Sequence, residues 1–410
     1  MSEGGDGSTT GAMKAGVTGI GAAAWRRGAG AAGAAVGVLA AGAAVGVAVE
    51  RLTVGRGMRR KARLALDSTG PYGTLRGRPG TAVAEDGTKL YYEVDEPAAD
   101  AAAARGGLAG FLGRRPAAPP LTVVFSHGYC LGQDSWHFQR AALREAGVRA
   151  VFWDQRSHGR SGRAPAATPI SIDLLGRDLK AVIDAAAPDG PLVLAGHSMG
   201  GMTTMALAAQ YPELITERVV GAAFVGTSSG RLLDVTYGLP AAGMNVLRRT
   251  VLPGAFKLMS VQTELVEKGR RATADLLAGI IRRYSFGSPK DVDPAVARFS
   301  ERLIEATPVD VVAAFYPAFG EHDKLAALAA FEDVPVLVLA GEKDLITPVS
   351  HSETIAEALP GAAELVIVPG AGHLVMLERP ELVDSHLAAL LQTATAAAAA
   401  SRPAARRTGR

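Results

Sequence analysis

A serine with a glycine two positions away on either side is the residue of this sequence best suited to chemistry. The segment Gly196–Gly201 reads GHSMGG, with the apolar run Leu192–Ala195 before it and a helix-forming stretch behind it. A sharp strand-to-helix turn strains the backbone of Ser198, and the residues two positions away must lack side chains, as Gly196 and Gly200 do. The N–H groups at the start of the following helix point to where a substrate oxygen would lie. The pattern predicts a nucleophilic serine.

Short, unalternated apolar runs must supply the sheet that holds this serine. Thr81–Ala84 and Lys89–Val94 flank a turn of the Glu-Asp-Gly type and indicate a hairpin. Further runs follow at Leu121–Phe125, Arg149–Trp153, Leu192–Ala195, Val219–Val225, Val336–Ala340 and Glu364–Val368. Helix-like stretches such as Asp173–Ala187 and Met199–Gln210 separate them. Runs of this kind suit strands buried on both faces, so we expect an α/β fold with a doubly wound, mostly parallel sheet.

One interval, residues 230–330, has no strand run and shows only helical periodicity, as at Thr273–Tyr284. A helical segment between two sheet strands indicates a cap inserted over the carboxyl edge of the sheet, where open α/β sheets bind ligands. We therefore expect four parts, listed here in chain order. They are a low-complexity basic arm (1–80), a core (81–229 and 331–394) that contains a loop insertion at 97–120, the helical cap (230–330), and a disordered tail (395–410).

The chain resembles enzymes of the α/β-hydrolase superfamily over roughly residues 81–394. Within that superfamily it is similar to the serine esterase and lipase group that includes monoacylglycerol lipases, through the residues of Gly196–Gly201. The resemblance implies the α/β-hydrolase fold and maps the family's nucleophile onto Ser198.

A histidine must act as the base, because a serine hydroxyl is a poor nucleophile until its proton is removed. Among eight histidines, His373 lies in the glycine-rich loop Pro369–Leu374, which is the position of the family's catalytic histidine. An imidazole pKa near 6.5 suits proton transfer at neutral pH. His351 and His386 lie in helical stretches and are expected on the surface.

The acid of the predicted triad is Asp344, which lies in a Gly-x-x-Asp-x-x-x-Pro motif after a predicted strand. A carboxylate there would hold the tautomer of the histidine and stabilise its cation. The order Ser198, Asp344, His373 is the one expected for this fold. Asp234, which follows the preceding strand, and Glu342, two residues from Asp344, are the rival candidates.

Two backbone N–H groups are expected to form the oxyanion hole. Met199 directly follows the nucleophile and should supply one donor. The pair His127-Gly128, after the strand Leu121–Phe125, resembles the family's His-Gly pair and places the second donor at Tyr129. His127 and Gly128 are therefore read as loop-shaping residues, as are Gly196 and Gly200 in the turn around the nucleophile.

The net charge of +3 divides unevenly along the chain. Residues 1–80 contain 11 basic and 4 acidic side chains, and residues 395–410 contain four arginines and no acid, which leaves a net charge of −8 between them. An acidic body argues against nucleic-acid binding. The single cysteine, Cys130, excludes an intrachain disulfide and a cysteine-based zinc site. Because the histidines and carboxylates lack ligand spacing, no metal or cofactor is expected.

The basic arm contains 22 consecutive residues, 28–49, without a charged or polar side chain. That length would cross a bilayer core as a helix, but its alanine and glycine content makes insertion marginal. A membrane anchor, a flexible low-complexity segment and a cleaved export signal are the three interpretations. Because more basic residues follow the run than precede it, an anchor would leave the catalytic domain in the cytoplasm.

Apolar residues of the cap suggest a pocket for an acyl chain. We expect hydrolysis of carboxylic esters with an apolar acyl chain, including lipids such as monoacylglycerols, through an acyl-serine intermediate. The same triad could serve an acyltransferase, a thioesterase or a cofactor-free perhydrolase. Ser198 argues against epoxide hydrolases and dehalogenases, which place aspartate there, and the complete triad argues against a non-catalytic binding protein. The oligomeric state is left open.

Overall fold

An eight-stranded sheet is the centre of the described structure, a computed structural model that describes residues 72–97, 119–166, 168–236, 254 and 274–400. The strands are β1 (Arg78–Val83), β2 (Lys89–Asp95), β3 (Thr122–Ser126), β4 (Arg149–Trp153), β5 (Leu192–His197), β6 (Val219–Val225), β7 (Val336–Gly341) and β8 (Ala363–Val368). Their order in the sheet is β1-β2-β4-β3-β5-β6-β7-β8. Strands β1, β2 and β4 pair antiparallel, and all pairs from β4 to β8 are parallel.

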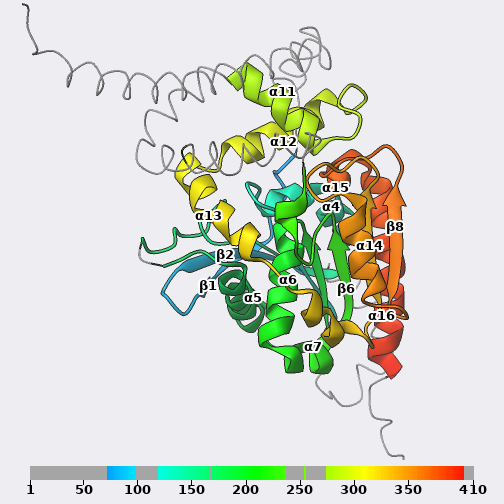
Figure 1. The fold of residues 1–410 in the computed structure, drawn as a ribbon. Coiled ribbons are helices and arrows are strands. Elements are labelled where there is room, and N and C mark those ends of the chain that lie inside the picture. The colour runs from blue at the N-terminus through cyan, green and yellow to red at the C-terminus, as the bar shows by residue number, and fades with distance from the viewer. Residues whose placement is uncertain (1–71, 98–118, 167, 237–253, 255–273, 401–410) are drawn as a thin grey trace, which may run out of the picture. The chain divides into compact units, whose positions relative to one another are not determined.

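Helices cover both faces of this sheet (Figure 1). The first group consists of α5 (Ile172–Ala186), α6 (Met199–Gln210), α7 (Pro212–Arg218) and α14 (Val349–Glu357). The second group consists of α4 (His137–Glu145), α15 (Val375–Glu378) and α16 (Pro380–Ala400). Alternate strand residues serve the two cores, because successive side chains of a strand point to opposite faces. Val124 and Leu194 pack with the first group, whereas Val123 and Val193 pack with the second.

The described part of the interval after β6 is helical, as predicted. Its elements are the 3-10 turns η3 (Leu232–Asp234) and η5 (Leu325–Phe331) and the helices α11 (Ala274–Ser285), α12 (Pro294–Glu305) and α13 (Val309–Glu321). Val311 and Phe315 of α13 belong to one buried apolar cluster with Leu175 of α5 and Met202 of α6. The predicted fold class, a doubly wound and mostly parallel α/β sheet with a helical cap insertion, is confirmed.

Two predicted boundaries are wrong. Helix α16 continues to Ala400, so residues 395–400 are not a disordered tail; alanine, the best helix former, makes up most of this stretch. At the other end, β1 begins at Arg78 rather than at residue 81. Before it, Tyr72 packs edge-on against Phe138 of α4 and also contacts Phe299 of α12, so the arm does not extend to residue 80.

The apolar segment 28–49, the insertion at 98–118 and the tail from 401 onward lie outside the described residues. No helix within the described ranges combines the length and the apolar character needed to cross a bilayer.

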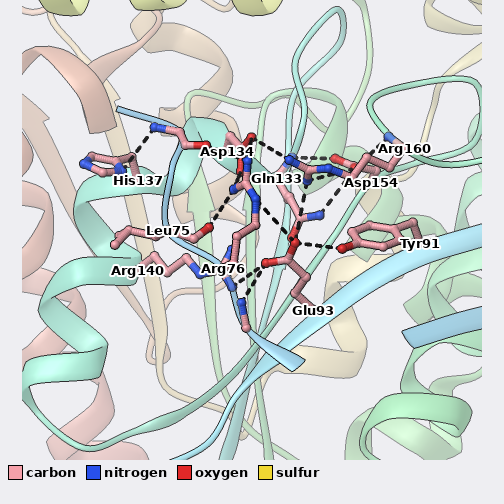
Figure 2. A network of polar contacts seen from close by, with 12 residues as sticks. Leu75, Arg76, Tyr91, Glu93, Gln133, Asp134, His137, Arg140, Asp154 and Arg160 are labelled. Atoms are coloured by element: carbon pink, nitrogen blue, oxygen red, sulfur yellow. Dashed lines mark hydrogen bonds and ion pairs between the residues drawn. The ribbon is translucent and has the colours of Figure 1, made fainter. Parts of the chain in front are cut away.

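An ionic network with a buried centre joins the start of the sheet to α4 and to the loop after β4 (Figure 2). The guanidinium of Arg140 lies 2.7 Å from the carboxylates of both Glu93 and Asp95, and Arg76 pairs with Asp134 at 2.8 Å. Burial raises the pKa of Glu93, but hydrogen bonds from the Gly77 N–H and from Arg140 outweigh it, so the net shift is downward. The network fastens residues 76–95 to the framework that holds the site.

Candidate active site

Ser198 lies at the turn between β5 and α6, with φ 51° and ψ −117°. A positive φ strains any residue with a side chain. The glycines around it make the turn sterically feasible. A Cβ on Gly196 would lie 2.5 Å from the carbonyl carbon of Gly200, and a Cβ on Gly200 would overlap the carbonyl oxygen of Ser126 at the end of β3. The serine is held in a turn that only glycines at these two positions permit.

His373 and Asp344 form a direct hydrogen bond. His373 Nδ1 lies 2.8 Å from Asp344 Oδ2, and both side chains are buried. Asp344 Oδ1 accepts the N–H groups of Ile346 and Thr347, and Oδ2 also accepts the hydroxyl of Thr347. An ionised carboxylate accepts such donors on both oxygens. Because Nδ1–H of His373 donates to Asp344, its Nε2 carries the lone pair that a general base needs.

His197, the residue before the serine, ties His373 to the turn. Its Nε2 lies 3.0 Å from the carbonyl oxygen of His373, and the two rings are 4.8 Å apart. Since a carbonyl only accepts, Nε2 of His197 is the protonated nitrogen. Burial and the neighbouring His373 lower the pKa of His197 well below its usual value. In the described residues no hydrogen bond joins Ser198 Oγ to His373, and such bonds are often long without substrate.

The predicted oxyanion donors also lie at the turn. A Cβ on Gly128 would be 2.7 Å from His197 Nδ1 and 3.2 Å from the Cβ of Ser198, so the loop after β3 lies directly against Ser198. Met199 is the first residue of α6. Neither the N–H of Tyr129 nor that of Met199 donates to an acceptor among the described residues. The predicted role of these two N–H groups as oxyanion donors is compatible with that arrangement.

Two buried histidines, His127 and His158, hold the loop after β3 in place through hydrogen bonds. Nδ1 of His127 donates to the Gly128 carbonyl at 2.7 Å, and its Nε2 accepts the N–H of Gln155. His158 accepts the N–H of Cys130, a residue with φ 59°. Burial lowers the pKa of His127 to about 4, and burial together with His127 lowers the pKa of His158 to about 3. Both rings are therefore neutral at pH 7, as their acceptor nitrogens require.

Neither rival acid contacts His373. Asp234 is largely exposed and pairs with Arg231 at 2.9 Å. Glu342 accepts the N–H of Gly370 at 2.8 Å and is exposed.

Residues of the cap contact Tyr129 in the loop after β3. The hydroxyl of Tyr129 donates to the Val312 carbonyl of α13 at 2.5 Å, and its ring contacts Phe315 and Phe319. Met199 belongs to the same apolar cluster. The loop that carries a proposed oxyanion donor is thus bonded to the cap.

His197 and Thr347 are part of this arrangement but received no role of their own from the sequence. His197 occupies the unconstrained position of the Gly-x-Ser-x-Gly pattern, and Thr347 lies inside the motif that contains Asp344, so their positions in these motifs were the only signal. Among the described residues, no group of three or more histidines, cysteines or carboxylates is arranged to hold a metal ion.

Comparison with known proteins gives the family. The model of the alpha/beta hydrolase fold matches residues 122–380, which include every residue of the candidate site. The chain is a member of the α/β-hydrolase family.

Curated relatives cover most of the same region. The chain is 26% identical over 275 residues to a non-heme haloperoxidase of Rhodococcus erythropolis, covering 66% of this chain and 92% of that one. It is 27% identical over 266 residues to the sn-1-specific diacylglycerol lipase ABHD11 of Mus musculus, covering 63% and 77%. A bifunctional esterase/perhydrolase of Acinetobacter calcoaceticus is 26% identical, with 66% and 91% covered.

Solved structures share the fold. A thermophilic esterase from Thermogutta terrifontis aligns with a TM-score of 0.56 at 22% identity, covering 78% of this chain and 99% of the other.

Proposed function

We propose that this protein is a serine hydrolase that cleaves carboxylic esters with an apolar acyl chain through an acyl-serine intermediate. The observation that carries the proposal is the hydrogen bond between His373 Nδ1 and Asp344, together with the bond from His197 that holds the backbone of His373 beside the turn of Ser198. The curated relatives, which include a lipase and an esterase/perhydrolase, support ester chemistry.

In the proposed first half-reaction, Ser198 Oγ attacks the ester carbonyl while Nε2 of His373 takes the hydroxyl proton. Asp344 stabilises the imidazolium that forms. The N–H groups of Tyr129 and Met199 bind the negative oxygen of the tetrahedral intermediate. When the intermediate collapses, the bond to the leaving alkoxide breaks and His373 protonates it, which leaves an acyl-serine and a free alcohol.

In the second half-reaction, His373 takes a proton from water as the water oxygen attacks the acyl-serine. Collapse releases the carboxylic acid and returns the proton to Ser198. The apolar cluster of α13 and α6 around Tyr129 supports an apolar acyl group, since such pockets are mainly apolar. Lipid esters, monoacylglycerols among them, are the substrates that this surrounding favours.

The central test is Ser198→Ala. The variant should lose labelling by a fluorophosphonate probe, and hydrolysis of p-nitrophenyl esters should fall by about 10⁴-fold or more. A chain-length series of p-nitrophenyl esters, thioesters and glycerides on the wild-type protein identifies the acyl group. Hydrolysis by Ser198→Ala near the wild-type rate would refute the assignment.

Perhydrolysis is the second candidate, favoured by the similarity to a haloperoxidase and an esterase/perhydrolase. In this reaction hydrogen peroxide replaces water, attacks the acyl-serine and releases a peracid, with no metal or redox step. Peracid formation from an ester and peroxide should depend on Ser198 as hydrolysis does. If wild-type protein hydrolyses the ester but forms no peracid, this candidate is removed.

For the N-terminal arm we propose membrane association through residues 28–49, flanked by basic side chains that suit an anionic cytoplasmic leaflet. Fractionation of cells that express the full chain tests this. Recovery of all the hydrolase in the soluble fraction at low salt would contradict it.

A further inference from the structure

Glu378 is a buried carboxylate that the proposed mechanism does not use. It is the last residue of α15, five positions after His373, and is only 7% exposed. Its Oε2 accepts the N–H of Gly372 at 2.7 Å and that of Gly287 at 3.1 Å. Its Oε1 accepts the N–H of Ser288 at 3.2 Å. Among the described residues no cation forms an ion pair with it, and the hydrogen bonds to its two oxygens come from these three backbone N–H groups.

These three donors belong to two segments that are far apart in sequence. Gly372 directly precedes His373, whereas Gly287 and Ser288 form the turn between α11 and α12 of the cap. The segments are packed without a gap at this point, because a Cβ on Gly372 would lie 2.5 Å from the carbonyl carbon of Phe286. A further hydrogen bond, from the Leu374 N–H to the Ser285 carbonyl at 2.8 Å, runs beside the carboxylate.

Such a carboxylate has a strong preference for one geometry. A buried charge is costly unless hydrogen bonds compensate it, and bonds to an ionised acceptor are roughly twice as strong as neutral ones. The loop before His373 contains two glycines, one of them Gly370 with φ 70°, and glycines leave a loop free to sample other conformations. Satisfying Glu378 removes that freedom next to the base.

We propose that Glu378 is a positioning residue that sets the place of His373 by clamping the loop before it to the cap turn at Gly287 and Ser288. The inference rests on the proposed function, in which His373 is the base. It adds to that function that the position of His373 depends on how the cap turn at Gly287 and Ser288 packs against the loop before it. The clamp contacts the backbone of the base loop, so its effect on catalysis is independent of the acyl chain.

The variant that tests this is Glu378→Gln, which keeps the size of the side chain but has a single acceptor oxygen. Its NH₂ group must face at least one of the three N–H donors. A displacement of the base by about 1 Å can cost about 100-fold in rate, so we expect kcat to fall by about 10- to 100-fold with KM nearly unchanged. The fall should be the same for p-nitrophenyl acetate and octanoate, and labelling by a fluorophosphonate should slow in parallel.

The matched control is Glu342→Gln. Glu342 also accepts an N–H of this loop, that of Gly370, but it is exposed and, within the described part of the chain, its side chain makes no hydrogen bond to the cap turn. Its kcat should stay within about twofold of the wild type, as expected for an exposed hydrogen bond. Hydrogen–deuterium exchange gives a readout that does not require activity. Peptides covering 284–290 and 370–376 should both exchange faster in Glu378→Gln, and only the second should do so in Glu342→Gln.

Equal kinetics and equal exchange in the two glutamine variants would overturn the proposal, and so would a loss that grows with acyl chain length, which indicates contact with substrate. If circular dichroism shows that Glu378→Gln is unfolded, Glu378→Asp, which keeps the charge and shortens its reach, is subject to the same criteria. Wild-type protein that neither labels nor hydrolyses any ester would contradict the proposed function instead. Coupled exchange of the two peptides would still support the clamp.

Discussion

The candidate site contains histidines whose ring nitrogens each face a defined hydrogen-bond partner. His373 donates to a carboxylate, whereas His197 and His127 donate to backbone carbonyls. A carbonyl cannot donate, so the nitrogen that faces it must carry the proton. In His127 this leaves Nε2 as an acceptor for the Gln155 N–H, and in His373 the Nδ1–H donated to the Asp344 carboxylate leaves a lone pair on Nε2, the nitrogen of the proposed base. The tautomers follow from the surroundings of each ring.

Replacement of the acid separates Asp344 from its rivals. Asp344→Asn should lower kcat for ester hydrolysis by about 10³- to 10⁴-fold, because an amide can donate to His373 Nδ1 and stabilise the wrong tautomer. Asp234→Asn, at the exposed partner of Arg231, should stay within about twofold. The measurement is kcat on p-nitrophenyl butyrate, with circular dichroism as the check on folding. Comparable losses in the two variants would mean that the acid is misassigned.

At this scale the sequence indicated the residues that belong to short motifs and missed those that act across the fold. Ser198, Asp344 and His373 each lie in a local pattern of glycines and prolines, and the structure brings Asp344 and His373 into contact. Glu378 looks like an ordinary acidic residue at the end of a helix. Its three donors come from segments about 90 and 6 residues away along the chain, and no local pattern encodes that meeting.

Among the secondary-structure elements, β3, β5 and α6 meet at the turn that holds Ser198. At Gly196 and Gly200 they approach so closely that a side chain would not fit. Gly200 lies against the end of β3, where backbone rather than a flexible side chain would meet an added carbon. Backbone cannot move aside without disturbing the parallel pairing of β3 with β5.

Gly200→Ala should therefore lower the stability of the protein as well as its ester hydrolysis. Overpacking of this kind costs about 1–3 kcal/mol in the free energy of unfolding, measured by urea denaturation. Gly361→Ala is the matched control, since no atom lies within 4 Å of its added Cβ. The control should stay within about 1 kcal/mol of the wild type. Equal stability of the two variants would show that the turn tolerates a side chain.

Element types were predictable because apolar runs buried on both faces carry a strong signal. Arg149–Trp153 and Val219–Val225 are strands with the predicted bounds. Element ends were less predictable, because packing decides them. The hairpin strand starts at Arg78, where β1 pairs with Val94 of β2, and a pattern of apolar residues does not report an exposed edge strand.

On the scale of the whole molecule, His322 marks the junction where the cap returns to the core. It follows α13, and its Nε2 donates to the Ser228 carbonyl at 2.8 Å. Its Nδ1 is buried with no hydrogen-bond partner in the described part of the chain. Burial lowers the pKa of His322 to about 4. A proton on Nδ1 would be buried without an acceptor.

Acidification should lower the free energy of unfolding through His322. An unfolded histidine has a pKa near 6.5, so between pH 6.5 and about 4 the unfolded chain binds more protons at this position, and stability falls as the pH falls. Between pH 7.5 and 5, His322 should cost the wild type about 2 kcal/mol of unfolding free energy. His322→Gln, which has no titrating ring, should not show that part of the loss. Burial raises the pKa of Asp384 to about 6, so Asp384 adds to stability as the pH falls. This contribution is the same in the wild type and in His322→Gln and does not affect their difference.

Urea denaturation at the two pH values measures the difference. His386→Gln serves as the control, because His386 is partly exposed and pairs with Glu364 at the surface; it should follow the wild-type pH dependence. If His322→Gln loses as much stability as the wild type on acidification, the buried ring is not the source.

Tyr72 has a mechanical consequence for whatever precedes it in the chain. Its ring contacts His137 and Phe138 of α4 and also Phe299 of α12. Four residues later, Arg76 is pinned to Asp134. A force applied to the chain before residue 72 would therefore act first on the contacts of Tyr72 and Arg76 with α4, α12 and Asp134, and only then on the edge strand β1. A shortened expression product should start at or before Tyr72, because one started at residue 81 would cut β1 in half and remove this joint.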